Sequence, residues 1–334
     1  MRAAFYTAHG DLDQLRLGTL PDPVLEAGDV LVRVRAAALN GFDPMMLAGS
    51  TTLQTPFPMI PCGDCAGEIA ALGPGVDQGG WAVGQRVSVV PYSEARGMMG
   101  ETATGGACEY VAVSAANLLL LPEGIGFVNA AALPIAYGTA YRMLFERGGL
   151  CSGETVLILG AAGGVGMACV QLAKTAGAIV LAAASTAAKA TALAEAGADH
   201  VIDTSSTDLT EAVRAIVGRA RVSGTGGVDM LVNFVGGATW SSSQRLLRKH
   251  GRLLCCGASA GHLAELDLRY LWSFEHVIIG SDGWSADDQR TLLTMVAEKR
   301  LQPVIHAVRP LDDIRTAMQE MVDRSVVGKS ILLV

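Results

Sequence analysis

The sequence predicts an α/β protein of two domains, one of them β-rich and the other a doubly wound parallel sheet. In the first third of the chain, short runs alternate between apolar and polar residues, whereas the middle contains continuous apolar runs separated by helical stretches. Strands that lack alternation and are spaced by helices are typical of parallel sheets covered on both faces. The length of 334 residues agrees with this division, since a domain usually has about 150 residues.

The β-rich domain is expected to comprise residues 1–121. From Val30 to Arg35, valine occupies every second position, which is the pattern of a strand with one buried face. Further apolar runs at 67–72, 86–90 and 108–113 are separated by glycine-rich turns. These features predict a mostly antiparallel first domain.

Residues 122–267 are expected to form the parallel sheet, and residues 268–334 to return to the first domain. Strands are predicted at 155–159, 179–184, 200–202, 228–235 and 252–256, and helices at 164–176, 186–196, 209–220 and 239–250. The last part should contain helices near 287–299 and 312–324 and a strand at 330–334.

Composition excludes several classes of function. The 25 basic and 32 acidic residues give a net charge of −7, and no basic run could follow a phosphate backbone, so no nucleic acid partner is expected. The most apolar stretch, 155–185, is interrupted by Gly160, Gly163, Gly164 and Gly166 and contains Gln171 and Lys174, so no membrane span is expected. An N-terminus without an export signal and seven cysteines without framework spacing predict reduced thiols and a cytoplasmic protein.

A glycine-rich turn joins the predicted strand 155–159 to the following helix. It reads Gly160-Ala161-Ala162-Gly163-Gly164-Val165-Gly166. Glycine allows a tight turn and a close approach of the backbone to a pyrophosphate, and the N–H groups at the start of a helix can bind the anion. Such a turn can also simply end a strand, but the strand before it and the helix after it favour a dinucleotide site. The residues expected to bind the dinucleotide here are Gly160, Ala162, Gly163, Gly164 and Val165.

Two later segments follow strands of the same predicted sheet. Phe234 and Val235 lie at the end of one strand, and Cys256, Gly257 and Ala258 follow the next. Ligands of doubly wound sheets bind outside the carboxyl ends of the strands. We therefore expect these five residues to line the dinucleotide.

The end of the second strand of the sheet predicts which dinucleotide binds. Sites selective for NAD place an acidic residue there, about 20 positions after the glycine turn, to bind the ribose 2′-hydroxyl. Here no carboxylate occurs before Glu195, whereas Ser185 and Thr186 can donate hydrogen bonds and Lys189 can bring a cation to a 2′-phosphate. The prediction is NADPH; alternatively, Lys189 is simply a solvated helix residue.

Several short motifs occur in a fixed order along the chain: ALNGFD (38–43), GDCAGE (63–68), GPGV (73–76), GGACEYV (105–111), AALP (131–134), TAY (139–141), GADHVI (197–202), GRL (251–253) and GK (328–329). With the glycine turn, they make the whole chain resemble the zeta-crystallin-like quinone oxidoreductase branch of the medium-chain dehydrogenase/reductase superfamily. The resemblance implies a GroES-like catalytic domain, a Rossmann domain, and a homodimer joined through an edge strand at 276–280. The segment 267–280 is closer to zinc-type and acyl-thioester reductase relatives than to short quinone reductases.

The superfamily contains members with and without zinc. Zinc-containing relatives have ligands at the positions that match Asn40, Gly63 and Ile135, and none of these three side chains is a usable zinc ligand. The four cysteines of the structural zinc lobe are also missing. Cys62 and Cys65 have a C-x-x-C spacing that fits metal binding or buried thiols, and buried thiols are favoured because no second pair follows. No metal is expected.

Without a Lewis acid, hydride transfer to an acceptor that is already electrophilic is the easier reaction, which indicates quinones or α,β-unsaturated carbonyls. The resemblance places Asn40 beside the nicotinamide and substrate, Thr139 near the nicotinamide, and Lys329 near the cofactor. Alternatives are a loop-capping role for Asn40, a packed helix position for Thr139 and a surface charge for Lys329.

The segment 91–100 replaces the zinc lobe and is expected to be a mobile loop over the substrate. Its Tyr92 is a candidate proton donor by position alone. The overall prediction is an NADPH-dependent, zinc-independent oxidoreductase. The alternatives are an NADP-dependent alcohol or aldehyde dehydrogenase and a non-catalytic nucleotide-binding relative.

Overall fold

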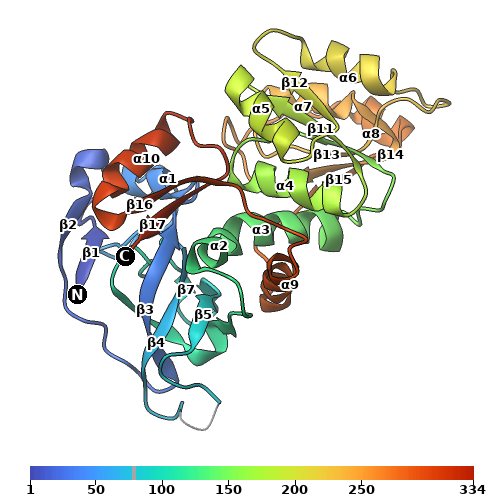
Figure 1. The fold of residues 1–334 in the computed structure, drawn as a ribbon. Helices are drawn as coiled ribbons and strands as arrows, with labels where there is room; N and C mark the ends of the chain where they lie inside the picture. The colour runs from blue at the N-terminus through green and yellow to red at the C-terminus, as the bar shows by residue number, and fades with distance from the viewer. Residues whose placement is uncertain (77–79) are drawn as a thin grey trace. The chain divides into compact units, whose positions relative to one another are not determined.

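The computed structural model describes residues 1–76 and 80–334. It consists of two compact units, both shown in Figure 1. Unit 1 comprises Met1–Ala136 and Ala286–Val334, and unit 2 comprises Tyr137–Ser285. Both chain ends therefore belong to unit 1, and the last part of the chain returns to the first domain, whereas the divisions were expected after residues 121 and 267.

Local packing explains why the divisions lie later in the chain. Helix α2 (Phe127–Ala132) packs against strands β3 (Asp29–Ala38) and β4 (Asp64–Leu72) of unit 1. Strand β15 (Val277–Gly280) pairs in parallel with β14 (Leu247–Cys255) of unit 2. Residues 122–136 are thus part of unit 1, and residues 268–285 are part of unit 2.

Unit 1 is built on a mainly antiparallel sheet in the order β16-β17-β3-β4-β5-β9, with β8 also paired to β3. The remaining strands are β1 (Arg2–Phe5), β2 (Arg16–Thr19), β5 (Arg86–Val89), β6 (Tyr92–Ser93), β7 (Gly97–Met98), β8 (Tyr110–Ser114), β9 (Leu118–Leu120), β16 (Ile305–Pro310) and β17 (Lys329–Leu333). The helices are η1 (Leu12–Gln14), α1 (Asp43–Ala48), η2 (Ala115–Asn117), α2, α9 (Ala286–Ala297), η4 (Leu311–Asp313) and α10 (Ile314–Val322).

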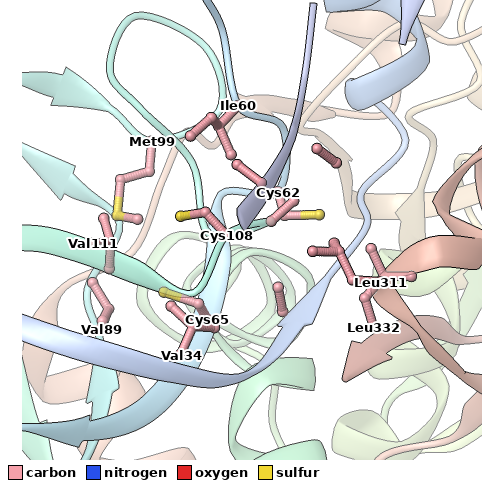
Figure 2. Close-up of a cluster of buried hydrophobic side chains, with 14 of the residues drawn as sticks. Val34, Ile60, Cys62, Cys65, Val89, Met99, Cys108, Val111, Leu311 and Leu332 are labelled. Atoms are coloured by element: carbon pink, nitrogen blue, oxygen red, sulfur yellow. The ribbon is translucent and has the colours of Figure 1, made fainter. Parts of the chain in front are cut away.

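The core of unit 1 follows from the alternation in β3. Val30, Val32 and Val34 are buried, whereas Arg33 between them is exposed. Figure 2 shows Val34 in a cluster with Val89, Val111 and the three thiols of Cys62, Cys65 and Cys108. The period-two pattern therefore predicts the buried face correctly.

Unit 2 is a six-stranded sheet in the order β12-β11-β10-β13-β14-β15, and all neighbouring strands are parallel. This is the doubly wound order of a Rossmann sheet, as the sequence predicts. Its strands are β10 (Thr155–Ile158), β11 (Ile179–Ala184), β12 (His200–Asp203), β13 (Val228–Val232), β14 and β15. Its helices are η3 (Arg142–Arg147), α4 (Gly164–Thr175), α5 (Ala187–Glu195), α6 (Leu209–Val217), α7 (Thr239–Gln244) and α8 (Leu268–Ser273), while α3 (Pro134–Tyr141) leads into the unit.

One predicted helix is too long. The helix expected at 239–250 ends at Gln244, because Leu247 already pairs with Val228 as the first residue of β14. Both residues belong to the hydrophobic core of unit 2. Burial of Leu247 against Val228 therefore overrides the local helical preference. Among the described residues, no helix has the length and hydropathy needed to cross a membrane.

Candidate functional site

The glycine turn lies at the carboxyl edge of the unit 2 sheet, between β10 and α4. Gly160 has a φ of +65°, and a Cβ on it would lie 3.0 Å from Cε2 of Phe234, which follows the neighbouring strand β13. A Cβ on Gly166 would overlap the Gly160 carbonyl oxygen and lie 2.6 Å from Cα of Ala161. These two glycines therefore pack the turn and the helix closely against the sheet. The sheet order reverses between β10 and β13, which is where doubly wound sheets bind ligands.

The open side of this turn fits the pyrophosphate of a dinucleotide. Gly163 is the N-cap of α4 and makes no side-chain capping hydrogen bond. A Cβ at Gly163 would meet nothing nearer than the Gly160 oxygen, at 3.7 Å. The next residues, Gly164 and Val165, belong to the first turn of a 12-residue helix, whose N–H groups have no partners within the helix. Such a cradle can bind an anion through its backbone.

A residue that was not predicted from the sequence holds the neighbouring turn. The side chain of Asn233 is buried at the end of β13, and its Oδ1 accepts hydrogen bonds from the N–H groups of Val235 and Gly236, both at 3.0 Å. Its Nδ2 donates to Thr239 Oγ1 at 3.0 Å and to Ser243 Oγ at 2.9 Å. An amide directly after the apolar strand 228–232 and before two glycines is the signal that would have identified it.

The structure brings the predicted strand-end segments together. The N–H of Ser259 donates to the Phe234 oxygen at 3.0 Å, and that of Ala260 donates to the Val235 oxygen at 2.7 Å. A Cβ on Gly257 would lie 3.7 Å from Cβ of Phe234. The segment that begins at Cys256 and includes Ala258 therefore lies beside Phe234 and Val235. The side chains of Phe234 and Val235 themselves lie against Gly160 of the glycine-rich turn.

The residues predicted to select the cofactor lie at the end of β11. Lys189 Nζ donates to Ser185 Oγ at 3.3 Å, so a cation and a hydroxyl lie together there. Thr186 is the N-cap of α5, and its Oγ1 accepts the Lys189 N–H at 3.3 Å. Ser185 and Thr186 are exposed, and Lys189 is partly exposed. This arrangement could bind a phosphate group, and none of the side chains of Ser185, Thr186 and Lys189 is a carboxylate.

A buried polar network lies at one end of three adjacent strands in unit 1. β3 lies between β4 and β17, and its Ala38 pairs with Asp64 on one side and with Ile331 on the other. Because both pairings are antiparallel, the chain after Ala38 passes between the first residues of β4 and β17. Asn40 therefore meets Asp64 and Lys329, although the three residues are far apart in the sequence.

The contacts in this network are short and mutually consistent. Lys329 Nζ donates to the Leu39 oxygen at 2.9 Å, to Asn40 Oδ1 at 2.5 Å and to Asp64 Oδ2 at 2.9 Å. Asn40 Nδ2 donates to Asp64 Oδ2 at 3.0 Å, and Asp64 Oδ1 accepts the Ile135 N–H at 2.9 Å. The side chains of Lys329 and Asp64 are 2% and 0% exposed. Lys329 thus uses its three N–H donors within the protein, which differs from the cofactor contact predicted for it.

Asp43 supports the same network through the backbone of Asn40. Its Oδ2 accepts the Asn40 N–H at 2.7 Å, and its Oδ1 accepts the Cys62 N–H at 2.9 Å. Burial raises the pKa of Asp43 to about 7, against the lowering effects of these two N–H donors and of the Lys329 ammonium. Asp64 and the buried hydroxyl of Tyr6 also face this carboxyl.

The titration of Asp43 predicts a pH-dependent stability. Because its folded pKa of about 7 lies above its ordinary value of 3.8, the folded state keeps a proton that the unfolded chain loses. The contribution of Asp43 to the free energy of unfolding is therefore greatest below about pH 4, declines up to about pH 7 and is constant above that. The total change is on the order of 4 kcal/mol, because each unit of pKa difference corresponds to about 1.4 kcal/mol. Urea unfolding from pH 4.5 to 8 measures the free energy of unfolding of the wild type and of Asp43→Asn. The amount by which the wild-type value exceeds that of the variant should become smaller as the pH rises. A constant difference would contradict this.

The residues that match the zinc ligands of relatives do not fit a zinc ion. A Cβ on Gly63 would lie 2.7 Å from Cδ1 of Ile135, so these two positions do converge. The side chains at the three positions are nevertheless the amide of Asn40, the single hydrogen of Gly63 and the alkyl chain of Ile135, and none of these groups binds zinc. Among residues 1–76 and 80–334, no group of three or more His, Cys, Asp or Glu side chains could hold a metal.

The cysteines with C-x-x-C spacing are buried thiols. Cys62 and Cys65 are fully buried in the core of unit 1, where Figure 2 shows them with Cys108. Burial raises the pKa of the first two well above their ordinary range and that of Cys108 to about 12. These thiols are therefore protonated and part of the apolar core.

The other two predicted catalytic residues lie in β6 and α3. Tyr92 is 56% exposed in β6, and among the described residues its hydroxyl has no hydrogen-bond partner. Thr139 is half-buried in α3. In segment 91–100, which was predicted to be a mobile loop, β6 and β7 pair as an antiparallel hairpin. Arg96 between these two strands donates to both carboxylate oxygens of the buried Asp29, at 2.8 and 2.9 Å.

Each unit contains a pocket among its described residues. One in unit 1, of about 350 Å³, is lined by Pro91, Arg96 and Met99 among others, and one in unit 2, of about 410 Å³, is lined by Arg219, Arg221 and Arg269 among others. Neither is lined by Asn40, Tyr92 or Thr139. These pockets therefore do not identify the substrate.

Comparison with known proteins identifies the family. A family model described as "Alcohol dehydrogenase GroES-like domain" matches residues 26–123, and one described as "Zinc-binding dehydrogenase" matches residues 164–298. The synaptic vesicle membrane protein VAT-1 homolog of Danio rerio is 30% identical over 99% of this chain and 69% of its own length. The quinone oxidoreductase of Homo sapiens is 28% identical over 100% of this chain and 98% of its own length. A crystal structure of an NAD-dependent alcohol dehydrogenase is 30% identical, with a TM-score of 0.91 over 100% of both chains.

The parallel sheet with its glycine turn and the β-rich unit define an oxidoreductase fold that uses a nicotinamide nucleotide. The chain belongs to the medium-chain dehydrogenase/reductase superfamily, in its quinone oxidoreductase-like branch. The resemblance stated from the sequence motifs is therefore confirmed.

Proposed function

We propose that this protein is an NADPH-dependent, zinc-independent oxidoreductase that transfers a hydride to a quinone or an α,β-unsaturated carbonyl. The observation that carries the proposal is the buried Asn40, Asp64 and Lys329 network, because it lies where zinc-containing relatives have metal ligands and offers no ligand set of that kind. An acceptor that is already electrophilic needs no Lewis acid. The likeness to a human quinone oxidoreductase supports the same acceptor class.

Each part of the chain has a role in this proposal. A bound nicotinamide supplies the hydride. The pyrophosphate is bound by the glycine turn and lined by the segments that follow β13 and β14, namely Phe234, Val235, Cys256, Gly257 and Ala258. The 2′-phosphate is bound by Ser185, Thr186 and Lys189. Thr139 contacts the nicotinamide. Tyr92 is the candidate proton donor.

Asn40 is the group proposed to contact the acceptor. One N–H of its Nδ2 donates to Asp64, whereas the other is directed at the Ala38 oxygen, which lies 3.5 Å from Nδ2, a long distance for a hydrogen bond. That second N–H, which has only this long contact, is the donor proposed for the carbonyl oxygen on which negative charge develops. A fixed donor at such an oxygen stabilises the transition state more than the ground state.

The test is turnover of NADPH, followed at its absorbance band, with a panel of quinones and enones and with primary alcohols plus NADP⁺. We expect activity with quinones or enones that persists in a metal chelator, from protein without bound zinc. Alcohol oxidation that depends on stoichiometric zinc would instead support the alternative, an alcohol or aldehyde dehydrogenase. Binding of NADPH without turnover on any acceptor would favour a non-catalytic relative.

The cofactor preference predicts the effect of a double substitution. Ser185→Asp with Lys189→Ala removes the cation and hydroxyl at the end of β11 and adds a carboxylate that repels a 2′-phosphate and can bind a 2′-hydroxyl. NADPH should bind at least tenfold more weakly, while NADH binding is unchanged or stronger. Fluorescence titration with both dinucleotides measures this. An unchanged preference would remove these residues from the phosphate site.

We also propose a homodimer. β15 is at the end of the described sheet order, and Val277 and Ile278 on it are 48% and 38% exposed. Pairing with a second copy would cover this edge strand. Light scattering on the purified protein measures the mass in solution.

A further inference from the structure

One charged contact in unit 1 is fully enclosed by protein. The Lys329 ammonium and the Asp64 carboxylate lie 2.9 Å apart, with side chains 2% and 0% exposed. For comparison, the side chains of the ion pair between Lys174 and Asp199 are 43% and 31% exposed. A buried ion pair gives little net stability compared with apolar side chains of similar volume. Its presence beside Asn40 therefore points to a role other than stability.

The pair determines how the Asn40 amide is oriented. Oδ1 of Asn40 accepts from the Lys329 ammonium, and Nδ2 donates to the Asp64 carboxylate. If the amide were flipped, its oxygen would face a carboxylate and its NH₂ group would face an ammonium, and both contacts are repulsive. One orientation of the amide is thus strongly preferred. The backbone N–H of Asn40 is held as well, by Asp43.

We propose that Lys329 is a positioning residue, an internal cation that with Asp64 fixes the orientation of the Asn40 amide. This leaves the second N–H of Asn40, which has only a long contact to the Ala38 oxygen, as the donor for the acceptor. This inference rests on the proposed function, in which Asn40 contacts the acceptor. The ammonium also draws electron density from the amide oxygen, which makes the N–H groups of Asn40 better donors. Lys329 itself contacts neither substrate nor cofactor in this account.

The decisive variant removes both charges together. Lys329→Met alone leaves the Asp64 carboxylate buried and unpaired, so a large loss of thermal stability is expected. The double variant Lys329→Met/Asp64→Asn has no uncompensated charge, and an amide oxygen at position 64 can still accept the Ile135 N–H. Its stability should recover. Its kcat should remain at least tenfold below the wild type, because the NH₂ group at position 64 then faces Asn40 and favours the flipped orientation of the Asn40 amide.

A spectroscopic measurement tests the orientation without turnover. The two side-chain N–H resonances of Asn40, assigned with an Asn40→Asp variant, should be distinct and slow to exchange with solvent in the wild type. They should shift and exchange faster in the double variant. The matched control is Lys174→Met, which removes a lysine from a partly exposed pair with Asp199 and should change neither stability, kcat nor these resonances measurably.

The outcomes separate this inference from the proposed function. Recovery of both stability and kcat in the double variant, or unchanged Asn40 resonances, would show that the pair is only structural and overturn the inference. A low kcat with recovered stability, an unchanged Kd for NADPH and altered resonances would support it. If the wild type reduces none of the acceptors, the proposed function fails, and the resonances alone still decide whether Lys329 orients Asn40.

Discussion

Replacing Gly163 with alanine is expected to weaken NADPH binding at least 100-fold while unit 2 keeps its fold. Gly163 has a φ of −72°, which alanine adopts without strain, and a Cβ there would lie 3.7 Å from the nearest atom. The protein therefore has room for the methyl group, whereas a pyrophosphate against the N-terminus of α4 does not. A 100-fold loss corresponds to about 2.7 kcal/mol of binding free energy. Fluorescence titration with NADPH measures the loss, and thermal unfolding reports on the fold.

Unit 1 offers a matched control for this substitution. Gly126 is also the N-cap of a helix, α2, with a φ of −78° and no side-chain capping hydrogen bond, and a Cβ on it would meet no atom within 4 Å. Gly126→Ala should cost about as much stability as Gly163→Ala, roughly 0.5–1 kcal/mol, and leave NADPH binding unchanged. Equal NADPH affinity in the two variants would show that the open side of the Gly163 turn is not the pyrophosphate site.

Replacing Asn40 with alanine is expected to lower kcat at least 100-fold with NADPH affinity unchanged. The substitution removes the donor proposed for the acceptor oxygen, and loss of one such donor costs roughly 10²- to 10³-fold in turnover. It also leaves the Lys329 ammonium and Asp64 carboxylate paired with each other, so the charges stay balanced. Steady-state kinetics with the best quinone or enone measure kcat, and a separate titration measures the Kd for NADPH.

Stability must be measured on the same Asn40→Ala sample. The lost hydrogen bonds to Asp64 and Lys329 should cost about 1–3 kcal/mol, which leaves most of the protein folded at assay temperature. A folded variant with full turnover would show that Asn40 has no catalytic role. Equal losses of turnover and NADPH affinity would indicate a general disturbance of the site instead.

The proximity of the glycine turn to the segments that follow β13 and β14 could be predicted from the sequence because its signals are local. The glycine turn, the strand before it and the helix after it are contiguous, and the segments at Phe234 and Gly257 each follow an apolar strand. Parallel strands bring their carboxyl ends to one edge, so position in the chain was enough to predict their proximity. Asn233 was missed because its role depends on side-chain hydrogen bonds to its own turn and to α7.

The unit 1 network could not be predicted in the same way. Lys329 was expected near the cofactor because a lysine after a glycine near the chain end resembles a basic cofactor position. Its actual partners, Asn40 and Asp64, are set by the register of β17 and β4 against β3, which no local pattern encodes. The domain divisions and the end of α7 also differ from expectation because tertiary packing of α2, β15 and Leu247 decides them.

The most direct test of the proposed chemistry follows the hydride itself. Protein incubated with an enone and NADPH deuterated at C4, on one face or the other, should yield a reduced product with deuterium on its β-carbon for one of the two labelled forms, and zinc or chelator should make no difference. Mass spectrometry of the product detects the label. A product without deuterium from either form, or transfer only when zinc is added, would contradict the account.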